Sequence, residues 1–156
     1  MLTEEYSITE ISDKIIAALP YGPNFRFVDE IHFIDQERVE GSYTFRKDHS
    51  FYEDHFVGFP LTPGVILTEC MAQIGMVSLG IYLRNFDMGS DGLKFVFTSS
   101  NVDFKAPVHP GEKVTVKSEK SVFRLGKLRC SVQLFKEDQT LAAKGVLDGF
   151  IFSGDK

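Results

Sequence analysis

One acidic residue, Glu69, stands inside the most apolar stretch of the chain. Its neighbours are those of a buried helix: Val65, Ile66, Leu67, Cys70, Met71 and Ala72. An unpaired carboxylate in such surroundings is costly, so Glu69 must be neutralised, paired or turned to a cavity. Two interpretations stay open. Either Gln73 or a backbone group holds the carboxyl, or it has a raised pKa, stays protonated and donates a proton.

A histidine gives this acid a chemical counterpart. His55 lies in an irregular, aromatic segment upstream of Glu69 and, taken alone, would be an ordinary loop residue. A near-neutral base together with a protonated acid can move a proton from carbon onto a leaving oxygen. Gly64 adds a third group, because its N–H in the first turn of a helix favours a developing negative oxygen.

The remaining candidates for chemistry are weaker. We expect His32 to face solvent from a strand, and His49 and His109 to be surface loop residues. Cys70 fits a small buried hydrophobe, and with Cys130 it forms neither a disulfide framework nor a metal motif. The histidine spacings predict no metal site. Gly-x-Ser-x-Gly, phosphate-loop and dinucleotide motifs are absent from the sequence.

The N-terminal third predicts a helix and a hairpin. Ser7 and Glu10 match a capping box, isoleucines follow at helical spacing, and Pro20 ends the run. Apolar and polar residues then alternate over 25–45, with a turn near Asp35-Gln36. An irregular loop over 48–63 follows, of the kind that is more often functional than idle.

Residues 64–83 predict one long apolar helix, with Thr62 as N-cap and Pro63 as first helical residue. It would span about 30 Å, but Glu69 and Gln73 on one face argue against a membrane span. A helix apolar on all sides belongs in a protein core. Four strands are predicted after it: Leu93–Phe104, Glu112–Phe123, Lys127–Lys136 and Leu141–Phe152. The predicted architecture is α+β, a long antiparallel sheet around a central apolar helix.

Length and charge narrow the class of protein further. The 156 residues favour a single domain, 1–156. The 17 basic and 22 acidic residues give a net charge of −5, and no basic cluster predicts nucleic-acid binding. The acidic start, Met1 to Glu5, is unlike a leader peptide, so a cytoplasmic location is expected.

Three segments of the sequence resemble those of a known family. The run from His55-Phe56-Val57-Gly58-Phe59-Pro60 through Thr62-Pro63-Gly64-Val65 to Glu69-Cys70-Met71-Ala72-Gln73 resembles the signature of the FabZ-type (3R)-hydroxyacyl-[acyl-carrier-protein] dehydratases. Leu19-Pro20 through Phe27-Val28-Asp29, and Phe104-Lys105-Ala106-Pro107-Val108 with Pro110-Gly111, look like two further shared segments. The resemblance covers about residues 15–150.

The resemblance implies a hot-dog fold and a homodimer with active sites at its interface, with further assembly to trimers of dimers in some members. His55 resembles the catalytic base, Glu69 of the partner subunit the acid, and the Gly64 N–H the donor to the thioester carbonyl. Glu in place of Asp resembles the FabZ branch more than the FabA isomerase branch. Two positions depart from the family pattern: Asp54 lies where the family usually has glycine, and Val57 lies where it usually has proline. We expect retained chemistry with an unusual substrate or pH profile.

The resulting hypothesis is reversible dehydration of a (3R)-3-hydroxyacyl thioester to a trans-2-enoyl thioester, without a cofactor. The substrate would be carried by acyl carrier protein or coenzyme A. The residues expected to contact it are Phe56, Gly58, Pro63, Val65, Ile66, Met71 and Gln73. Basic residues available to dock an acidic carrier are Arg84, Lys94, Lys105, Arg124, Lys127 and Arg129. The alternatives are a hot-dog thioesterase, whose helix carboxylate activates water, and a non-catalytic acyl-binding subunit.

Overall fold

The computed structural model describes residues 5–89 and 92–153. The predicted single domain runs over 1–156, so its outermost residues fall outside this part. The same holds for residues 1–4 of the acidic start, on which the expectation of no leader peptide depended.

The first element confirms the capping-box prediction. Helix α2 (Ile8–Ala18) has Ser7 as N-cap: the Glu10 N–H donates to the Ser7 hydroxyl, and the Ser7 N–H donates to Glu10 Oε1, both at 3.2 Å. Ile11 and Ile15 are buried, because the helix packs against strand β1 (Glu30–Ile34). The short η1 turn (Pro23–Phe25) connects the two.

The long apolar helix is also confirmed, and it has an irregular middle. It comprises α4 (Gly64–Ala72), a π-helical turn η2 (Gln73–Val77) and α5 (Ser78–Leu83). Both the N–H and the hydroxyl of Ser78 donate to the Gln73 carbonyl, which closes the wider turn. These 20 residues are long and apolar enough to cross a membrane, but 72% of the most hydrophobic window is buried inside the protein, as in a core helix.

The start of this helix differs from prediction by one residue. The N-cap is Pro63 and the first helical residue is Gly64. Thr62 does not cap the helix, because its hydroxyl bonds to the Tyr52 hydroxyl at 2.5 Å and its N–H donates to the Val108 carbonyl.

Six antiparallel strands form one sheet in the order β1-β2-β4-β5-β6-β3. Their bounds after β1 are β2 (Arg38–Thr44), β3 (Leu93–Phe104), β4 (Lys113–Arg124), β5 (Lys127–Lys136) and β6 (Leu141–Ser153). The four predicted C-terminal strands agree within one residue. The predicted β1–β2 hairpin is present too, its turn held by Asp35 Oδ1, which accepts from the N–H groups of Glu37 and Arg38.

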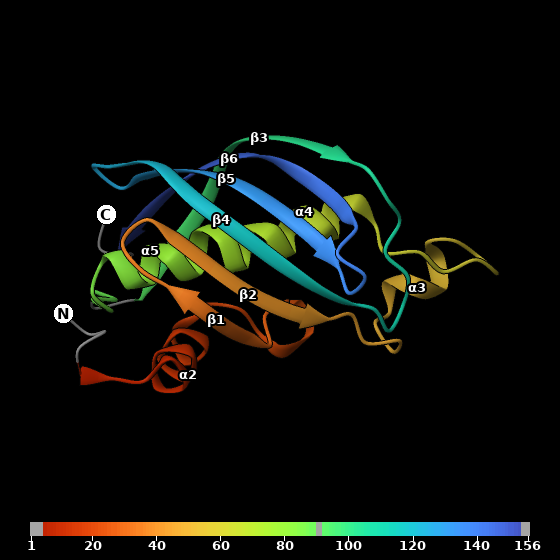
Figure 1. Ribbon diagram of the computed structural model, residues 1–156, viewed down its shortest axis with the longest axis horizontal. Coiled ribbons are helices and arrows are strands. Elements are labelled where there is room, and N and C mark those ends of the chain that lie inside the picture. Colours follow the sequence, from red (N-terminus) through yellow and green to blue (C-terminus); the bar gives the residue numbers. More distant parts are fainter. Residues whose placement is uncertain (1–4, 90–91, 154–156) are drawn as a thin grey trace.

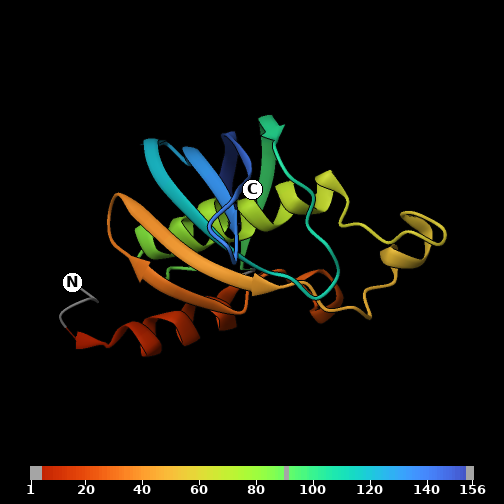
Figure 2. The same cartoon turned by 45° about the vertical axis from the view of Figure 1, so that its right-hand side comes forward.

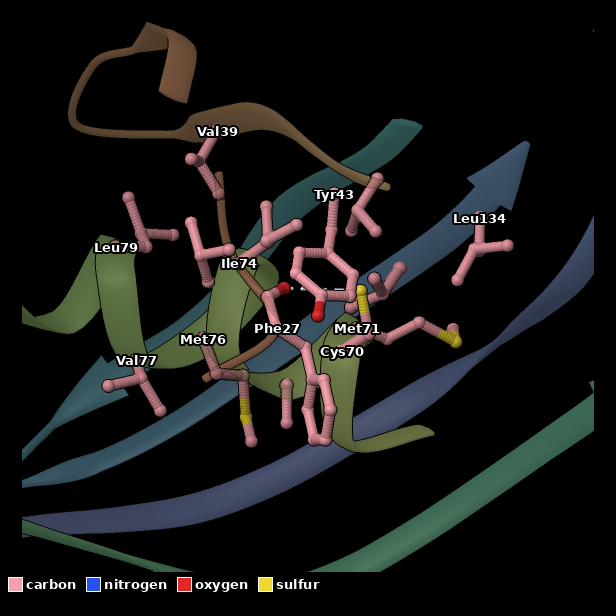
Figure 3. Packing of buried hydrophobic residues seen from close by; sticks show 14 of the residues in the cluster. Phe27, Val39, Tyr43, Cys70, Met71, Ile74, Met76, Val77, Leu79 and Leu134 are labelled. Atoms are coloured by element: carbon pink, nitrogen blue, oxygen red, sulfur yellow. Dashed lines mark hydrogen bonds between the residues drawn. The ribbon is translucent and has the colours of Figure 1, made fainter. Parts of the chain in front are cut away.

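The sheet curves around the central helix, which runs through the middle of the molecule (Figure 1). Side chains from both fill the space between them, including Tyr43, Ile74, Leu79 and Leu134 (Figure 3). The helix approaches β4 closely at Gly75, whose carbonyl accepts from the Ser118 hydroxyl at 2.9 Å. This is the expected hot-dog arrangement. It leaves most of strand β3 exposed at one edge of the sheet. The α3 loop, which carries α3 (Phe51–Asp54), buries Tyr52 but exposes residues 56–60.

Candidate active site

Glu69 is half-buried on α4 and bonded to the residue one turn later. Its Oε2 accepts from the Gln73 amide at 2.9 Å. Burial raises the pKa of Glu69, and the Gln73 hydrogen bond offsets part of that rise. The carboxyl therefore has the structural partner of the first interpretation. The direction of its pKa shift is the one that the second interpretation requires, and proton donation stays a prediction.

The carboxyl faces a cavity of about 160 Å³. The walls come from the loop before η1, the central helix and strands β3, β5 and β6. The lining residues are Tyr21, Phe25, Glu69, Ala72, Met76, Val77, Phe95, Val96, Phe97, Leu128, Gly149 and Ile151. The lining is apolar apart from Glu69 and Tyr21, which suits a hydrocarbon chain that ends at a proton donor.

His55 lies at the C-terminal end of α3, and Leu61 fixes its orientation. The His55 N–H donates to the Phe51 carbonyl, and the Leu61 N–H donates to the His55 carbonyl. The ring nitrogen Nδ1 lies 2.9 Å from the Leu61 carbonyl oxygen. Since a carbonyl oxygen only accepts, Nδ1 carries the proton, and Nε2 is left as the basic nitrogen.

A tight turn follows the histidine. Phe56 and Phe59 exchange backbone hydrogen bonds, and Gly58 between them has φ +73°. Positive φ at the third position is the mark of a type II turn, where proline is favoured at the second position but other residues fit. Val57 occupies that second position and is 86% exposed. The turn thus tolerates Val57 in place of the proline expected from the resemblance.

The other departure, Asp54, does not touch the imidazole. Asp54 is exposed, and no hydrogen bond joins it to the His55 ring within the described part of the chain. The ring instead lies against that of Phe56, with centroids 4.0 Å apart. The His55–Phe56 peptide bond is cis.

The structure does not bring His55 and Glu69 of one chain together. His55 is not among the residues that line the Glu69 cavity. The α3 loop instead reaches away from the sheet and the central helix, past the N-terminal end of α4 (Figures 1 and 2).

Gly64 lies at the N-terminus of α4, as predicted. Its N–H precedes every possible intrahelical acceptor and has no acceptor among the residues that the structure describes. A Cβ added to Gly64 would lie 3.1 Å from Cζ of Phe104, so the Phe104 ring covers this end of the helix. Sequence reasoning placed Phe104 in a shared segment without giving it a role.

The seven predicted substrate contacts differ in exposure. Phe56, Gly58 and Val65 are exposed and Ile66 is half-buried. Pro63 is buried beneath the helix start. Met71 and Gln73 are each 0% exposed in this chain and do not line the Glu69 cavity, and their contact with substrate stays a prediction. Met71 packs in the core between helix and sheet (Figure 3).

The Gln73 side chain links two segments of the chain and so acts as a clamp between them. Its Oε1 accepts from the Phe27 N–H at 2.7 Å, and its amide nitrogen donates to the Phe25 carbonyl at 2.8 Å and to Glu69. It therefore ties the loop before β1 to the acid. That loop contributes Tyr21 and Phe25 to the cavity, which only a structure could place there.

The prediction that His49 is a surface residue is wrong, because its side chain is buried, with 7% exposed. Its Nε2 lies 2.6 Å from the Tyr43 hydroxyl, and its ring stacks on Phe51 with centroids 4.8 Å apart. Burial, aided by Arg46, lowers the pKa of His49. Because Phe51 also holds the His55 N–H, His49 belongs to the base of the loop that carries the histidine.

The remaining candidates lie where the sequence indicated. His32 is partly exposed on β1 beside Glu30 and Ser42, and His109 is exposed. Cys70 is buried, and its thiol donates to the Phe27 carbonyl. Within residues 5–89 and 92–153, no three His, Cys, Asp or Glu side chains gather as a metal site.

A larger hollow, about 630 Å³, lies elsewhere on the sheet. Its walls carry side chains of both charges from β2 to β6, such as Arg38, Glu40, Lys117 and Lys144. Neither Glu69 nor His55 borders it, so the proton-transfer groups are confined to the smaller cavity and the α3 loop.

The model of the FabA-like domain matches residues 19–144, which include His55, Gly64 and Glu69. This chain belongs to the FabA-like family. Among FabA-like relatives, a 3-hydroxyacyl-[acyl-carrier-protein] dehydratase FabZ from Herpetosiphon aurantiacus is 34% identical over 138 residues, covering 86% of this chain and 93% of the relative. The FabZ of Thermus thermophilus is 30% identical over 132 residues, covering 83% and 89%.

Two solved structures of other proteins share the fold of this FabA-like chain. A chain of the dehydratase heterocomplex ApeI:P from Xenorhabdus doucetiae gives a TM-score of 0.76 at 14% identity, with 90% of this chain and 91% of the other covered. A hypothetical thioesterase with coenzyme A from Streptococcus pneumoniae gives 0.59 at 13% identity, with 94% and 98% covered. These likenesses concern the fold alone.

Proposed function

We propose that this chain is a 3-hydroxyacyl-[acyl-carrier-protein] dehydratase, a hydro-lyase of fatty-acid or related biosynthesis. It removes water reversibly from a (3R)-3-hydroxyacyl thioester and forms the trans-2-enoyl thioester. One observation carries the proposal: a carboxyl whose pKa is raised by burial faces an apolar cavity, in a chain about 30% identical to FabZ dehydratases.

The reaction divides into two proton transfers. His55 Nε2 takes the C2 proton, and the electron pair moves toward the thioester carbonyl, whose oxygen accepts from the Gly64 N–H. Glu69 gives its proton to the 3-hydroxyl, which leaves as water as the C2–C3 double bond forms. The imidazolium and the carboxylate then exchange protons with solvent. No electrons leave the substrate, so the reaction as written needs no cofactor.

The site requires two subunits in this proposal. His55 of one chain would reach the Glu69 cavity of its partner in a homodimer, which can assemble further into a trimer of dimers. Two observations support it: His55 does not border its own chain's cavity, and the outer edge of β3 has no partner strand among the described residues. Phe97 on that strand is 44% exposed and also lines the cavity.

Acyl carrier protein is the proposed carrier of the acyl group, and coenzyme A is a simpler alternative carrier. The proposed location of the reaction is the cytoplasm. The six basic residues named from the sequence do not form one surface. The sheet register places Lys94, Arg124 and Lys127 at one end of the sheet, while Lys105 follows β3 at the other end. Arg129 is paired with Asp148 at 2.6 Å, which leaves it less available for docking.

The proposal is tested by the hydration of crotonyl thioester, followed by loss of enoyl absorbance with a thiol reagent present. We expect absorbance loss without free thiol in the wild type, and none in His55→Ala and Glu69→Gln. Release of free thiol would assign a thioesterase instead. Inactivity toward both crotonyl and longer acyl-carrier substrates would leave a binding subunit.

A further inference from the structure

We propose that the Tyr21 hydroxyl binds the substrate's 3-hydroxyl opposite Glu69 and holds the water that this group becomes. The inference deepens the proposed dehydratase function and rests on it. Tyr21 would be the second polar group of the reaction pocket, contacting the oxygen that leaves in one direction and attacks in the other.

A series of contacts fixes Tyr21 on the wall of the Glu69 cavity. The Gln73 amide joins Glu69 at 2.9 Å to the Phe25 carbonyl at 2.8 Å. The Phe25 ring in turn packs on the Tyr21 ring, with centroids 6.3 Å apart. The clamp that orients the acid thus also positions the tyrosine.

Tyr21 is one of two side chains in the cavity lining that can form hydrogen bonds. Apart from Glu69, it supplies the lining's only side chain with a hydrogen-bonding O–H or N–H group. Its hydroxyl makes no hydrogen bond with the residues that the structure describes, and the phenol is half-buried. A hydroxyl in an apolar cavity favours a ligand that brings a partner to it, because an unpaired polar group there is costly.

The carboxyl alone cannot satisfy the departing oxygen. Oε2 of Glu69 is held by Gln73, which leaves Oε1 to deliver the proton and then to accept from the new water. The water oxygen still needs a donor on its other side. Tyr21 supplies one, and burial together with the negative charge of Glu69 raises the pKa of this phenol, so that it keeps its proton.

The test compares two thioesters that differ by one oxygen. In His55→Ala, which cannot take the C2 proton, we would measure by calorimetry the binding of 3-hydroxybutyryl-pantetheine and butyryl-pantetheine. The dissociation constant of the butyryl thioester divided by that of the 3-hydroxybutyryl thioester reports how much the 3-hydroxyl strengthens binding. Adding Tyr21→Phe should lower that ratio about 3- to 10-fold, as expected for one lost hydrogen bond.

Tyr6→Phe is the matched control, because Tyr6 packs on Lys14 outside the cavity and should leave the ratio unchanged. An unchanged ratio in Tyr21→Phe would overturn the inference while leaving the dehydratase proposal intact. If neither thioester binds His55→Ala, the proposed function itself fails, and the Tyr21 inference fails with it.

A kinetic split provides a second readout in the otherwise wild-type chain. The enoyl thioester has no 3-oxygen, so Tyr21→Phe should lower kcat for hydration about tenfold with little change in KM. For dehydration, KM of the 3-hydroxyacyl thioester should rise as well. A purely packing role for Tyr21 predicts neither change, since phenylalanine keeps the ring.

Discussion

Each of the two proposed catalytic side chains, His55 and Glu69, depends on a hydrogen bond that its own residue type does not reveal. The Leu61 carbonyl selects the His55 tautomer, and Gln73 orients Glu69. The sequence singled out both candidate residues, because a glutamate among apolar neighbours and a histidine in an aromatic loop can be recognised from residue types alone; their catalytic roles stay predictions. Their partners were harder to assign, since Gln73 looked equally suited to bind substrate.

Glu69 should reduce the stability of the protein that uses it. Because its folded-state pKa lies above the ordinary value of 4.5, its contribution to stability is fully present below pH 4.5 and is lost as the pH rises through the raised folded-state pKa. Glu69→Gln keeps an acceptor for Gln73 and removes the charge. Its thermal midpoint should exceed that of the wild type at pH 8, with no gain at pH 4.

The control is Glu119→Gln, which changes an exposed carboxyl of β4. Calorimetric scans of both variants at the two pH values check the prediction. An equal gain for Glu69→Gln at pH 4 and pH 8 would show that titration of this carboxyl is not the cause.

The Gly64 N–H can be removed without disrupting the helix. Proline is favoured at the first helical position, and Pro63 before it has ψ 139°, which a following proline accepts. Gly64→Pro should therefore lower kcat about 10²- to 10³-fold, the usual cost of one oxyanion donor. Gly64→Ala meets the same Phe104 ring but keeps the N–H, so it should stay within about fivefold of wild type in the enoyl hydration assay. Equal losses in both variants would assign the effect to the Phe104 contact.

At the scale of elements, periodicity predicted most of the chain. The capping box, the hairpin, the helix of 64–83 and four strands follow from local signals. The π turn over Gln73–Val77 does not, because nothing in its residue types separates it from an α-helix. Nor could the sequence show that His49 is buried, since the aromatic rings around it come from separate segments, such as Phe27, Tyr43 and Phe51.

His49 should make the α3 loop sensitive to acid. Its folded-state pKa is lowered from 6.5, so the unfolded chain binds the proton more readily. Wild-type stability should therefore be full above about pH 6.5 and fall as the pH drops toward the lower folded-state pKa. His49→Gln should lose about 1–2 kcal/mol at pH 7.5 through the Tyr43 bond and the ring stacking, and should lose less than wild type between pH 7.5 and 5.

Guanidinium unfolding at the two pH values measures this difference. His109→Gln, at an exposed histidine, should follow the wild type at both. A His49→Gln variant with the full wild-type loss of stability on acidification would rule out His49 as the titrating group.

At the scale of the whole molecule, the separation of His55 from the Glu69 cavity makes a prediction about mixed dimers. Neither His55→Ala nor Glu69→Gln should be active alone. After subunit exchange in a 1:1 mixture, half of the dimers combine both chains, and each such dimer has one intact site. Activity should therefore recover to about a quarter of the wild-type value. No recovery in mixtures shown by mass spectrometry to contain the heterodimer would place both groups in one subunit.

The outer edge of β3 has no partner strand among the described residues, and this affects the solubility of the chain. A twelve-residue edge strand with protruding Val96 and Phe97 is a template for unwanted pairing with other chains. Charged Lys94 and Asp103 near its ends act as gatekeepers against such growth. In the proposed homodimer, each newly synthesised copy would face this hazard until a second chain covered the edge. Substitutions of these two charged residues should reduce the soluble yield in expression before they reduce the activity of the molecules that fold.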